Sequence, residues 1–327
     1  HLLPLLDKAQ IPGVVSSSKL DSNCQIMRAV FRLHDVSGHT TELVEIRARN
    51  PSFHLVFIPG NPGVVTFYKD FVERLYELLG GTATITAVGH ISHTKEDWEH
   101  GGLFSLQDQI DHKVDFLKDE LRKIEVPIIL VGHSIGSYIS IETFKSSKKV
   151  IYCIGLYPFL ALNTKSAMQS MIRKIAGSPF ICAALSCAVA FLGLLPSWAS
   201  RFVVRASIGK SWCSAALDAA CTHLLKYHVM QNVLFMARTE FERLLEAPDW
   251  ELMRRNSGQI TFLFGTNDHW GPLTMLDEVS KHAPGVALSV EGEGHTHGFS
   301  CTEAGSSWAA HHVASVVQAL PEAARKT

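Results

Sequence analysis

Residues 126–138 read VPIILVGHSIGSY, and this stretch decides the fold. Its first half, Val126–Val131, has the β-branched and aliphatic composition of a buried strand, and the residues after the second glycine suit a helix. Between them, GHSIG matches the G-x-S-x-G pattern of a nucleophile elbow, in which a sharp turn lifts Ser134 Oγ clear of the strand's carboxyl end. The flanking glycines let neighbouring backbone pass close to the strained serine. The stretch predicts a nucleophilic serine, with an idle serine in a glycine-rich turn as the alternative.

The composition of the chain excludes several classes of protein. Its 327 residues, 46% of them hydrophobic, fit one large α/β domain with an insertion or two small domains. A net charge of −1 gives no field for nucleic acid, so no nucleic-acid partner is expected. The seven cysteines have no C-x-x-C spacing and indicate neither a disulfide framework nor a zinc site. We expect reduced thiols, no metal and no cofactor, and the residues after His1 predict no signal peptide.

Strand-like and helical segments alternate on both sides of the elbow. The expected core strands are Phe53–Ile58, Thr84–Val88, Val126–Val131, Val150–Leu156, Gln259–Phe264 and Gly285–Val290. Residues 26–48 predict a leading antiparallel meander, and Ser105 with Asp108 predicts a capping box at a helix start. The alternation is βαβ logic, which gives a mostly parallel central sheet with helices on both faces. The expected fold is therefore the α/β-hydrolase fold.

The alternation stops between residues 159 and 258, where the sequence is helical and no core strand is expected. We expect an inserted helical cap or lid here, with residues 26–158 and 259–327 forming the hydrolase core. Caps in this position usually shape the substrate pocket.

Inside the predicted cap, residues 179–195 read PFICAALSCAVAFLGLL, with no charge and one polar residue. Three interpretations are open: a buried cap helix, a transmembrane span, and a segment that dips into one lipid leaflet. A span needs ~20 apolar residues and would place the two parts of the sheet on opposite sides of the membrane, so it is the least favoured. The leaflet interpretation is favoured by Trp198 and by the basic residues that flank the segment. The expected lipid contacts are Phe180, Leu185, Phe191, Leu192, Leu194, Leu195 and Trp198.

The remaining catalytic candidates follow the elbow in the order expected for this fold, serine then acid then histidine. Asp268 comes just after the strand Gln259–Phe264 and is the expected acid, with capping of the next helix as the alternative. The base is His295 or His297. We favour His297, because Gly298 allows a close turn back toward the elbow.

A second loop is expected to supply an oxyanion donor. Residues 59–63 read PGNPG at the end of a strand, and because proline has no N–H the donors there are Gly60, Asn61 or Gly63. We favour Asn61, together with the N–H of Ile135 at the start of the elbow helix; a merely rigid turn is the alternative. The histidines His90 and His93 are expected either at the pocket mouth or in solvent.

These motifs together resemble those of the lipid droplet-associated hydrolases, a branch of the α/β-hydrolase superfamily. The resemblance runs from about Phe53 to Phe299 and rests on FIPGNPG at 57–63 with Phe67-Tyr68 beyond it, VGHSIGSY at 131–138 and GTNDHW at 265–270. The family's last motif, Pro-His-Ala-Phe, stands here as Thr296-His297-Gly298-Phe299, which supports His297 over His295. The sequence departs from the family in Thr296 and Gly298, and in the histidine rather than proline that follows Asp268.

The resemblance implies ester hydrolysis and targeting to lipid droplets through the apolar cap segment, with sterol esters suggested as substrates. The predicted function is thus a serine ester hydrolase that acts through an acyl-enzyme on lipid esters such as sterol esters or acylglycerols. Its partners are the lipid ester and a lipid surface, either a droplet or the endoplasmic reticulum membrane, on the cytosolic face; no protein partner is indicated. The alternatives are a weakly catalytic or non-catalytic droplet organiser, and an acyltransferase in which an alcohol competes with water.

Overall fold

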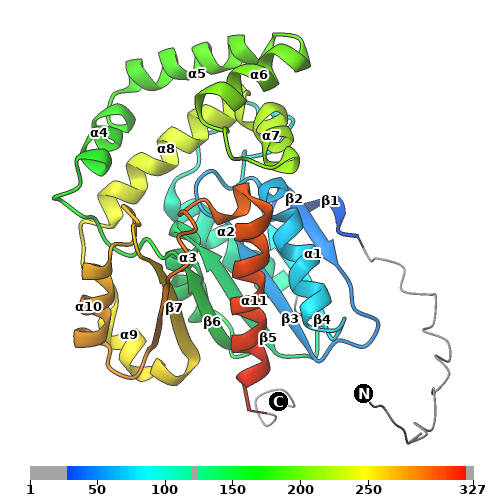
Figure 1. Cartoon of the computed structure of the whole chain (residues 1–327), viewed down its shortest axis with the longest axis vertical. Coiled ribbons are helices and arrows are strands. Elements are labelled where there is room, and N and C mark those ends of the chain that lie inside the picture. The colour runs from blue at the N-terminus through cyan, green and yellow to red at the C-terminus, as the bar shows by residue number, and fades with distance from the viewer. Residues whose placement is uncertain (1–27, 120–121, 123, 322–327) are drawn as a thin grey trace, which may run out of the picture.

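The computed structural model describes residues 28–119, 122 and 124–321, and its strands form one sheet of eight (Figure 1). In chain order they are β1 (Val30–Val36), β2 (His39–Ile46), β3 (Phe53–Ile58), β4 (Ala83–Val88), β5 (Ile128–His133), β6 (Val150–Leu156), β7 (Ile260–Gly265) and β8 (Ala287–Glu291). Across the sheet the order is β1-β2-β4-β3-β5-β6-β7-β8. β2 pairs antiparallel with β1 and with β4, and every pairing from β4 to β8 is parallel. The predicted fold class, a mostly parallel sheet, is confirmed.

The leading strands are antiparallel and are joined by the turn at Ser37-Gly38, as predicted. β1 and β2 form a hairpin whose turn, Ser37-Gly38, has positive φ angles of 52° and 86°. The second partner of β2 is β4 rather than the next strand in the sequence, so the two strands are added to the sheet as a hairpin at its edge. Residues 26 and 27 of the predicted segment lie outside the described residues.

The parallel strands are buried on both faces, which explains why they read as continuous apolar runs. Every residue of β3, β4, β5 and β7 is buried. Alternate residues serve opposite faces. Leu55 and Phe57 of β3 join the cluster with α1 (Lys69–Leu78) and α11 (Glu303–Ala319). Val56 and Ile58 join the cluster with α2 (Leu106–Asp119), α3 (Ile135–Phe144) and α10 (Leu273–His282).

At two helix starts, local sequence and tertiary packing together determine where the helix begins. The backbone N–H of Ser105 donates to Asp108 Oδ2 at 2.7 Å, and the N–H of Asp108 donates to Ser105 Oγ at 3.2 Å, so the predicted capping box is confirmed. The helix after β3 begins with the 3₁₀ turn η1 (Val65–Tyr68), and α1 follows it. That turn lets Tyr68 reach back to the preceding loop, as described below.

The segment between β6 and β7 is helical throughout and contains no strand. Its helices are α4 (Ala167–Ala176), α5 (Pro179–Gly193), α6 (Ser197–Ser207), α7 (Ser214–Ala219), η3 (Ala220–Leu224), α8 (Tyr227–Arg243), α9 (Trp250–Arg255) and η4 (Ser257–Gln259). Figure 1 shows α4 to α7 gathered beyond one end of the sheet, at the top of the view. α9 lies beside α10 instead, where Trp250 stacks on His282 with 5.2 Å between ring centroids. We therefore propose that the cap consists of α4 to α8.

Candidate active site

The turn between β5 and α3 has the geometry of a nucleophile elbow. Ser134 has φ 55° and ψ −125°, a strained conformation for a residue with a side chain. A Cβ on Gly132 would overlap the carbonyl oxygen of Gly136, and one on Gly136 would overlap that of Ile58. Both positions therefore require glycine, and the predicted reason for the two glycines in GHSIG is confirmed.

Three side chains that are far apart in the sequence meet at the carboxyl ends of β5, β7 and β8. His297 Nε2 lies 2.8 Å from Ser134 Oγ, and His297 Nδ1 lies 2.8 Å from Asp268 Oδ2. A neutral His297 accepts the hydroxyl proton of Ser134 at Nε2 while its Nδ1–H donates to Asp268. The structure brings together the three residues that were predicted as nucleophile, acid and base.

Asp268 is suited to remain ionised beside the imidazole. Burial works to raise the pKa of its carboxyl, but hydrogen bonds and charge from His297, together with the N–H groups of Trp270 and Gly271, outweigh burial and lower it. The N–H of Trp270 donates to Asp268 Oδ1 at 2.8 Å. Asp268 does not cap the next helix, since the cap of α10 is Pro272 and has no side-chain hydrogen bond.

The alternative base, His295, is turned away from Ser134. Its ring lies 5.8 Å from that of Trp308, and its Nε2 is 4.0 Å from Glu293 Oε2. The geometry therefore favours His297 as the partner of the serine.

Two of the three possible donors of the Pro59–Gly63 loop already have partners. The N–H of Gly60 donates to Tyr68 Oη at 3.2 Å, and the N–H of Gly63 donates to His93 Nδ1 at 2.8 Å. The N–H of Asn61 donates to no group within the described residues. Ile135 opens α3, and the first N–H groups of a helix have no acceptor within it. Asn61 and Ile135 are thus left with N–H groups available to an oxyanion.

Residues that sequence reasoning missed hold this loop in place. The Asn61 side chain donates from Nδ2 to Val233 O and to Glu240 Oε1, both at 2.9 Å and both on α8. Burial raises the pKa of Glu240 to about 8, against the lowering effect of the Asn61 hydrogen bond. No signal in the sequence singled out Glu240, because a glutamate in an amphipathic helix usually faces solvent.

His90 and His93 lie on the other side of the loop, and both expectations for them are wrong. Neither faces a pocket mouth or solvent, since both are fully buried. Burial and the nearby Lys113 lower the pKa of His93 to about 3, so it is neutral and accepts from Gly63. The N–H of His90 donates to Gly63 O at 3.1 Å. Their role in supporting a loop some 30 residues earlier could not be read from their local sequence.

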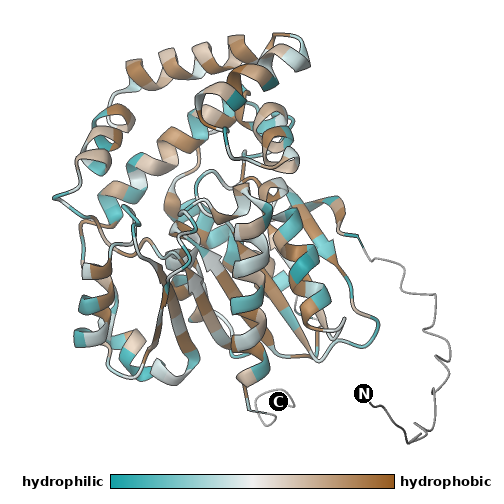
Figure 2. Ribbon diagram, in the orientation of Figure 1, coloured by the Kyte–Doolittle hydropathy of each residue, from teal (hydrophilic) through white to brown (hydrophobic). Residues whose placement is uncertain are grey.

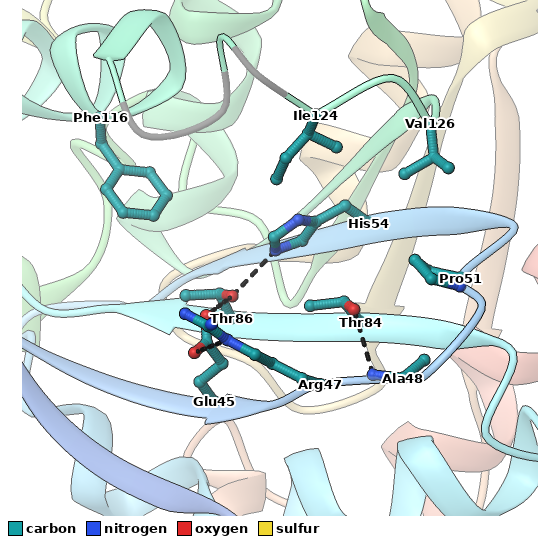
Figure 3. A pocket seen from close by; sticks show the side chains of 10 residues that line it. All are labelled: Glu45, Arg47, Ala48, Pro51, His54, Thr84, Thr86, Phe116, Ile124 and Val126. Carbon is teal, nitrogen blue, oxygen red and sulfur yellow. Dashed lines mark hydrogen bonds and ion pairs between the residues drawn. The ribbon is translucent and has the colours of Figure 1, made fainter.

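Two of the hollows in the described part of the chain lie beside the acid loop and at the amino ends of the strands, and neither is lined by Ser134. A groove of about 680 Å³ borders the acid loop and α4; it is lined by Asn163, Lys165, Ser166, Ala167, Met168, Met171, Asp268, His269 and Pro272. A second pocket of about 330 Å³ lies at the amino ends of β3 and β4 (Figure 3). Ser134 lies beyond the opposite, carboxyl ends of the strands. In it His54 Nε2 lies 2.9 Å from Thr86 Oγ1, which donates to Glu45 Oε1 at 3.0 Å. These contacts tie three adjacent strands together.

The apolar segment 179–195 forms an exposed helix, so the interpretation as a buried cap helix is wrong. Cys182 and Ser186 are its buried residues in α5, and Phe180 is 88% exposed. Figure 2 shows hydrophobic residues along α5. Exposed large apolar side chains of α5, α6 and their connection are Phe180, Ile181, Leu185, Phe191, Leu194, Leu195, Trp198, Phe202 and Val203. Leu192 differs from the expectation, because it is partly buried and packs against the core.

Among the described residues, a helix of sufficient length and apolarity to cross a membrane alone is not found. α4 and α5 together meet the length and composition for a span, but they are bent by 92°. The described His, Cys, Asp and Glu side chains also form no cluster of three or more that could hold a metal ion.

An eight-stranded, mostly parallel sheet with helices on both faces and a strained serine after β5 defines an α/β-hydrolase. Solved structures agree on the fold, at identities too low to show more. A membrane phospholipase A described as a bacterial virulence factor has a TM-score of 0.61, 11% identity, and coverage of 92% of this chain and 88% of its own. A haloalkane dehalogenase from Bradyrhizobium elkani has a TM-score of 0.64, 15% identity, and coverage of 89% and 100%.

The family follows from sequence. The profile of the lipid-droplet associated hydrolases matches residues 51–300, so the chain belongs to this family. A lipid droplet-associated hydrolase from Gallus gallus is 28% identical over 80% of this chain and 84% of its own length. One from Dictyostelium discoideum is 27% identical over 84% and 92%. The predicted family and the prediction of a hydrolase are confirmed.

Proposed function

We propose that the protein is a serine ester hydrolase that cleaves lipid esters at the surface of lipid droplets. The observation that carries the proposal is the contact of His297 Nε2 with Ser134 Oγ at 2.8 Å, on a histidine whose other nitrogen faces Asp268. The family is that of the lipid-droplet associated hydrolases. Sterol esters and acylglycerols are the substrates that the proposal includes.

In the proposed mechanism His297 acts first as a base and then as an acid in each half-reaction. His297 takes the proton of Ser134 as Oγ attacks the ester carbonyl, and Asp268 orients the imidazolium that forms. The N–H groups of Asn61 and Ile135 stabilise the tetrahedral oxyanion. His297 then protonates the departing alcohol and leaves an acyl group on Ser134. His297 next takes a proton from a water molecule, whose oxygen attacks the acyl carbonyl. As the bond from the acyl carbon to Ser134 Oγ breaks, His297 returns the proton to Oγ, and the acid is released.

The exposed apolar face of α5 and α6 is proposed to hold the enzyme on the lipid surface. Phe180, Phe191, Leu194 and Trp198 are each at least 70% exposed, although burying one such side chain is worth about 1.5–3 kcal/mol. Arg205 on α6 places positive charge beside this face, which suits anionic head groups, whereas Arg201 is paired with Asp218. The surface is a droplet monolayer, or the cytosolic leaflet of the endoplasmic reticulum membrane, which presents the same chemistry.

Removal of the nucleophile tests the catalytic part. Ser134→Ala is expected to lower the rate of ester hydrolysis on the order of 10⁴-fold to 10⁶-fold and to abolish labelling by a fluorophosphonate probe. Ser137→Ala is the matched control, because its Oγ donates to Gly132 O at 3.0 Å and lies within the helix after the elbow. Normal turnover by a folded Ser134→Ala protein would exclude the mechanism.

A droplet-organising role is the second candidate, and the exposed apolar face favours it. In that role the fold is an adaptor, and hydrolysis is weak or absent. Cells that lack the protein would be supplied with one of two variants. Full rescue of the droplet phenotype by Ser134→Ala, together with no rescue by a variant with charges on α5, would support this role over catalysis. Product analysis with an added alcohol separates hydrolysis from acyl transfer.

A further inference from the structure

A continuous chain of hydrogen bonds joins the oxyanion loop to the His297 loop through the residue that precedes Ser134. The N–H of Gly60 lies 3.2 Å from Tyr68 Oη, and Tyr68 Oη lies 2.7 Å from His133 Nδ1. His133 Nε2 lies 2.8 Å from the carbonyl oxygen of His297. The four residues come from the loop after β3, from η1, from the end of β5 and from the loop after β8. The hydrogen-bonded series therefore links every segment that contributes to the candidate site except the acid loop.

Elementary donor and acceptor rules give this chain one direction. A carbonyl oxygen only accepts, so His133 Nε2 carries the proton and donates to His297 O. Nδ1 of the same neutral ring then accepts, which makes the Tyr68 hydroxyl its donor. The oxygen of Tyr68 in turn accepts from the N–H of Gly60. One tautomer of His133 satisfies all three contacts. With the proton on Nδ1 instead, the ring could still donate to Tyr68 Oη, but Nε2 would face the carbonyl oxygen of His297 with no proton to donate, and that contact would be lost.

Both side chains remain neutral over the working pH range. Burial, assisted by the nearby His297, lowers the pKa of His133 to about 3, despite its backbone hydrogen bond. Burial also raises the pKa of the Tyr68 hydroxyl above its ordinary value. The tautomer is consequently fixed by the contacts rather than changed by titration.

Packing holds the His133 ring where it is. The ring lies edge-on to Phe299, with 5.0 Å between centroids, and it is 5.0 Å from the ring of His297. Tyr68 packs against Phe57 at 4.6 Å. Since His133 is bonded directly to Ser134, its contact with His297 O sets the position of the base relative to the nucleophile. A misplacement of about 1 Å at such a site costs on the order of 10²-fold in rate.

We propose that Tyr68 and His133 are positioning residues, which hold the His297 backbone and the oxyanion loop in register about Ser134. The inference rests on the proposed serine-hydrolase function. It assigns a role to His133, the first variable position of the G-x-S-x-G motif, and to Tyr68, the tyrosine after the PGNPG loop. Neither residue touches the reacting atoms; both act through the groups that they hold.

The test compares variants that remove hydrogen-bonding groups from Tyr68 or from His133. Tyr68→Phe deletes the hydroxyl and leaves the ring, so His133 Nδ1 and the N–H of Gly60 both lose a partner. His133→Phe deletes both nitrogens, whereas His133→Gln returns an N–H donor that can reach His297 O. Tyr138→Phe is the matched control, because it removes a hydroxyl whose partner is Arg243 Nε at 2.8 Å, outside the chain of hydrogen bonds.

Two measurements are made on each folded variant: the fluorophosphonate labelling rate of Ser134, and kcat and KM on a short soluble ester. The tautomer of His133 is measured by ¹⁵N NMR in the wild type. We expect Tyr68→Phe and His133→Phe to slow labelling and lower kcat by about 10-fold to 100-fold with little change in KM. His133→Gln is expected to recover part of the rate, and Tyr138→Phe to match the wild type. The wild-type His133 is expected to show a protonated Nε2 and an unprotonated Nδ1.

The outcomes separate the inference from the function on which it rests. If the wild type is labelled and Tyr68→Phe and His133→Phe are labelled equally fast, the positioning role is excluded and the serine hydrolase stands. A protonated Nδ1 on His133 in the wild type overturns the assigned direction of the chain and the inference with it. If the folded wild type is not labelled at all, the proposed function fails, and the positioning role falls as a consequence.

Discussion

The backbone of Ser134 is strained, and the glycines on either side of it make room for the strained turn. Its φ of 55° lies in a region that costs on the order of 1–3 kcal/mol for a residue with a Cβ. The conformation persists because Gly132 and Gly136 let three segments of backbone approach each other at the turn. The stability of the core and the exposure of the nucleophile are thus coupled at two residues that carry no side chain.

Gly136→Ala tests this coupling. The added Cβ would overlap the carbonyl oxygens of both Ile58 and Pro59, which are backbone atoms with little freedom to move. We expect the free energy of unfolding to fall by about 3 kcal/mol and labelling of Ser134 to be lost. Gly258→Ala is the control, because nothing lies within 4 Å of the corresponding Cβ and no positive φ is involved. Urea unfolding and probe labelling of both variants measure the difference, and equal stability would contradict the packing argument.

The sequence predicted the residues whose chemistry is coded in short motifs and missed those that act by support. Ser134, Asp268 and His297 lie in motifs whose spacing to a strand end is informative, and the structure brings them together. Asn61 was favoured because it follows the Pro59-Gly60 pair in a loop whose prolines have no N–H to donate. Tyr68 and Glu240 carry no such mark, because their partners are set by tertiary packing. Local sequence gives the reacting groups, and long-range contacts determine what holds them.

At the scale of elements, the apolar strands were predictable to within two residues, because burial on both faces leaves a continuous pattern. β3 and β6 have the predicted bounds, while β5 ends two residues later, at His133. The pairing of β2 with β4 was not predictable from pattern alone, since either neighbour would bury the same residues. The exposure of α5 could not be predicted from the sequence either, because an apolar helix has the same composition whether protein or lipid covers it.

Helix α8 places the carboxyl group of Glu240 in the interior of the protein. Glu240 is buried, and its pKa is raised from 4.5 to about 8. The folded protein therefore holds a proton that the unfolded chain releases above about pH 4.5, so the contribution of Glu240 to stability falls as the pH rises from about 5 to 8. At neutral pH the group is mostly protonated, and it does not repel an oxyanion near Asn61.

Glu240→Gln removes the titration and keeps an acceptor for Asn61 Nδ2. From pH 5 to pH 8, we expect the wild type to lose on the order of 3 kcal/mol of unfolding free energy relative to this variant. Glu242→Gln is the control, because Glu242 is on the same helix with its side chain 62% exposed and paired to Arg238. Urea titrations at both pH values give the difference. A variant whose stability follows the wild type in parallel would show that Glu240 is ionised in the fold.

At the scale of the whole molecule, the catalytic groups and the apolar face stand on different elements. Ser134 stands on the sheet, whereas Phe180 and Phe191 stand on α5, which packs on α8 and thereby on the helix that holds Asn61. Binding to lipid and cleavage of an ester are therefore separable functions in this architecture.

A double substitution, Phe180→Asp with Phe191→Asp, should break the first function and spare the second. Each change removes a side chain worth about 1.5–3 kcal/mol of lipid burial and adds a charge, so we expect binding to phospholipid-coated triacylglycerol droplets to fall at least 100-fold. Both side chains are exposed and contact no part of the site, so kcat on a short soluble ester should stay within about twofold. Leu245→Asp is the control, since Leu245 is 54% exposed but lies beyond α8, away from α5. Droplet flotation and soluble-ester assays on the same preparations decide the matter: equal flotation of all variants excludes α5 as the anchor, and loss of the soluble activity would show that α5 is part of the catalytic unit.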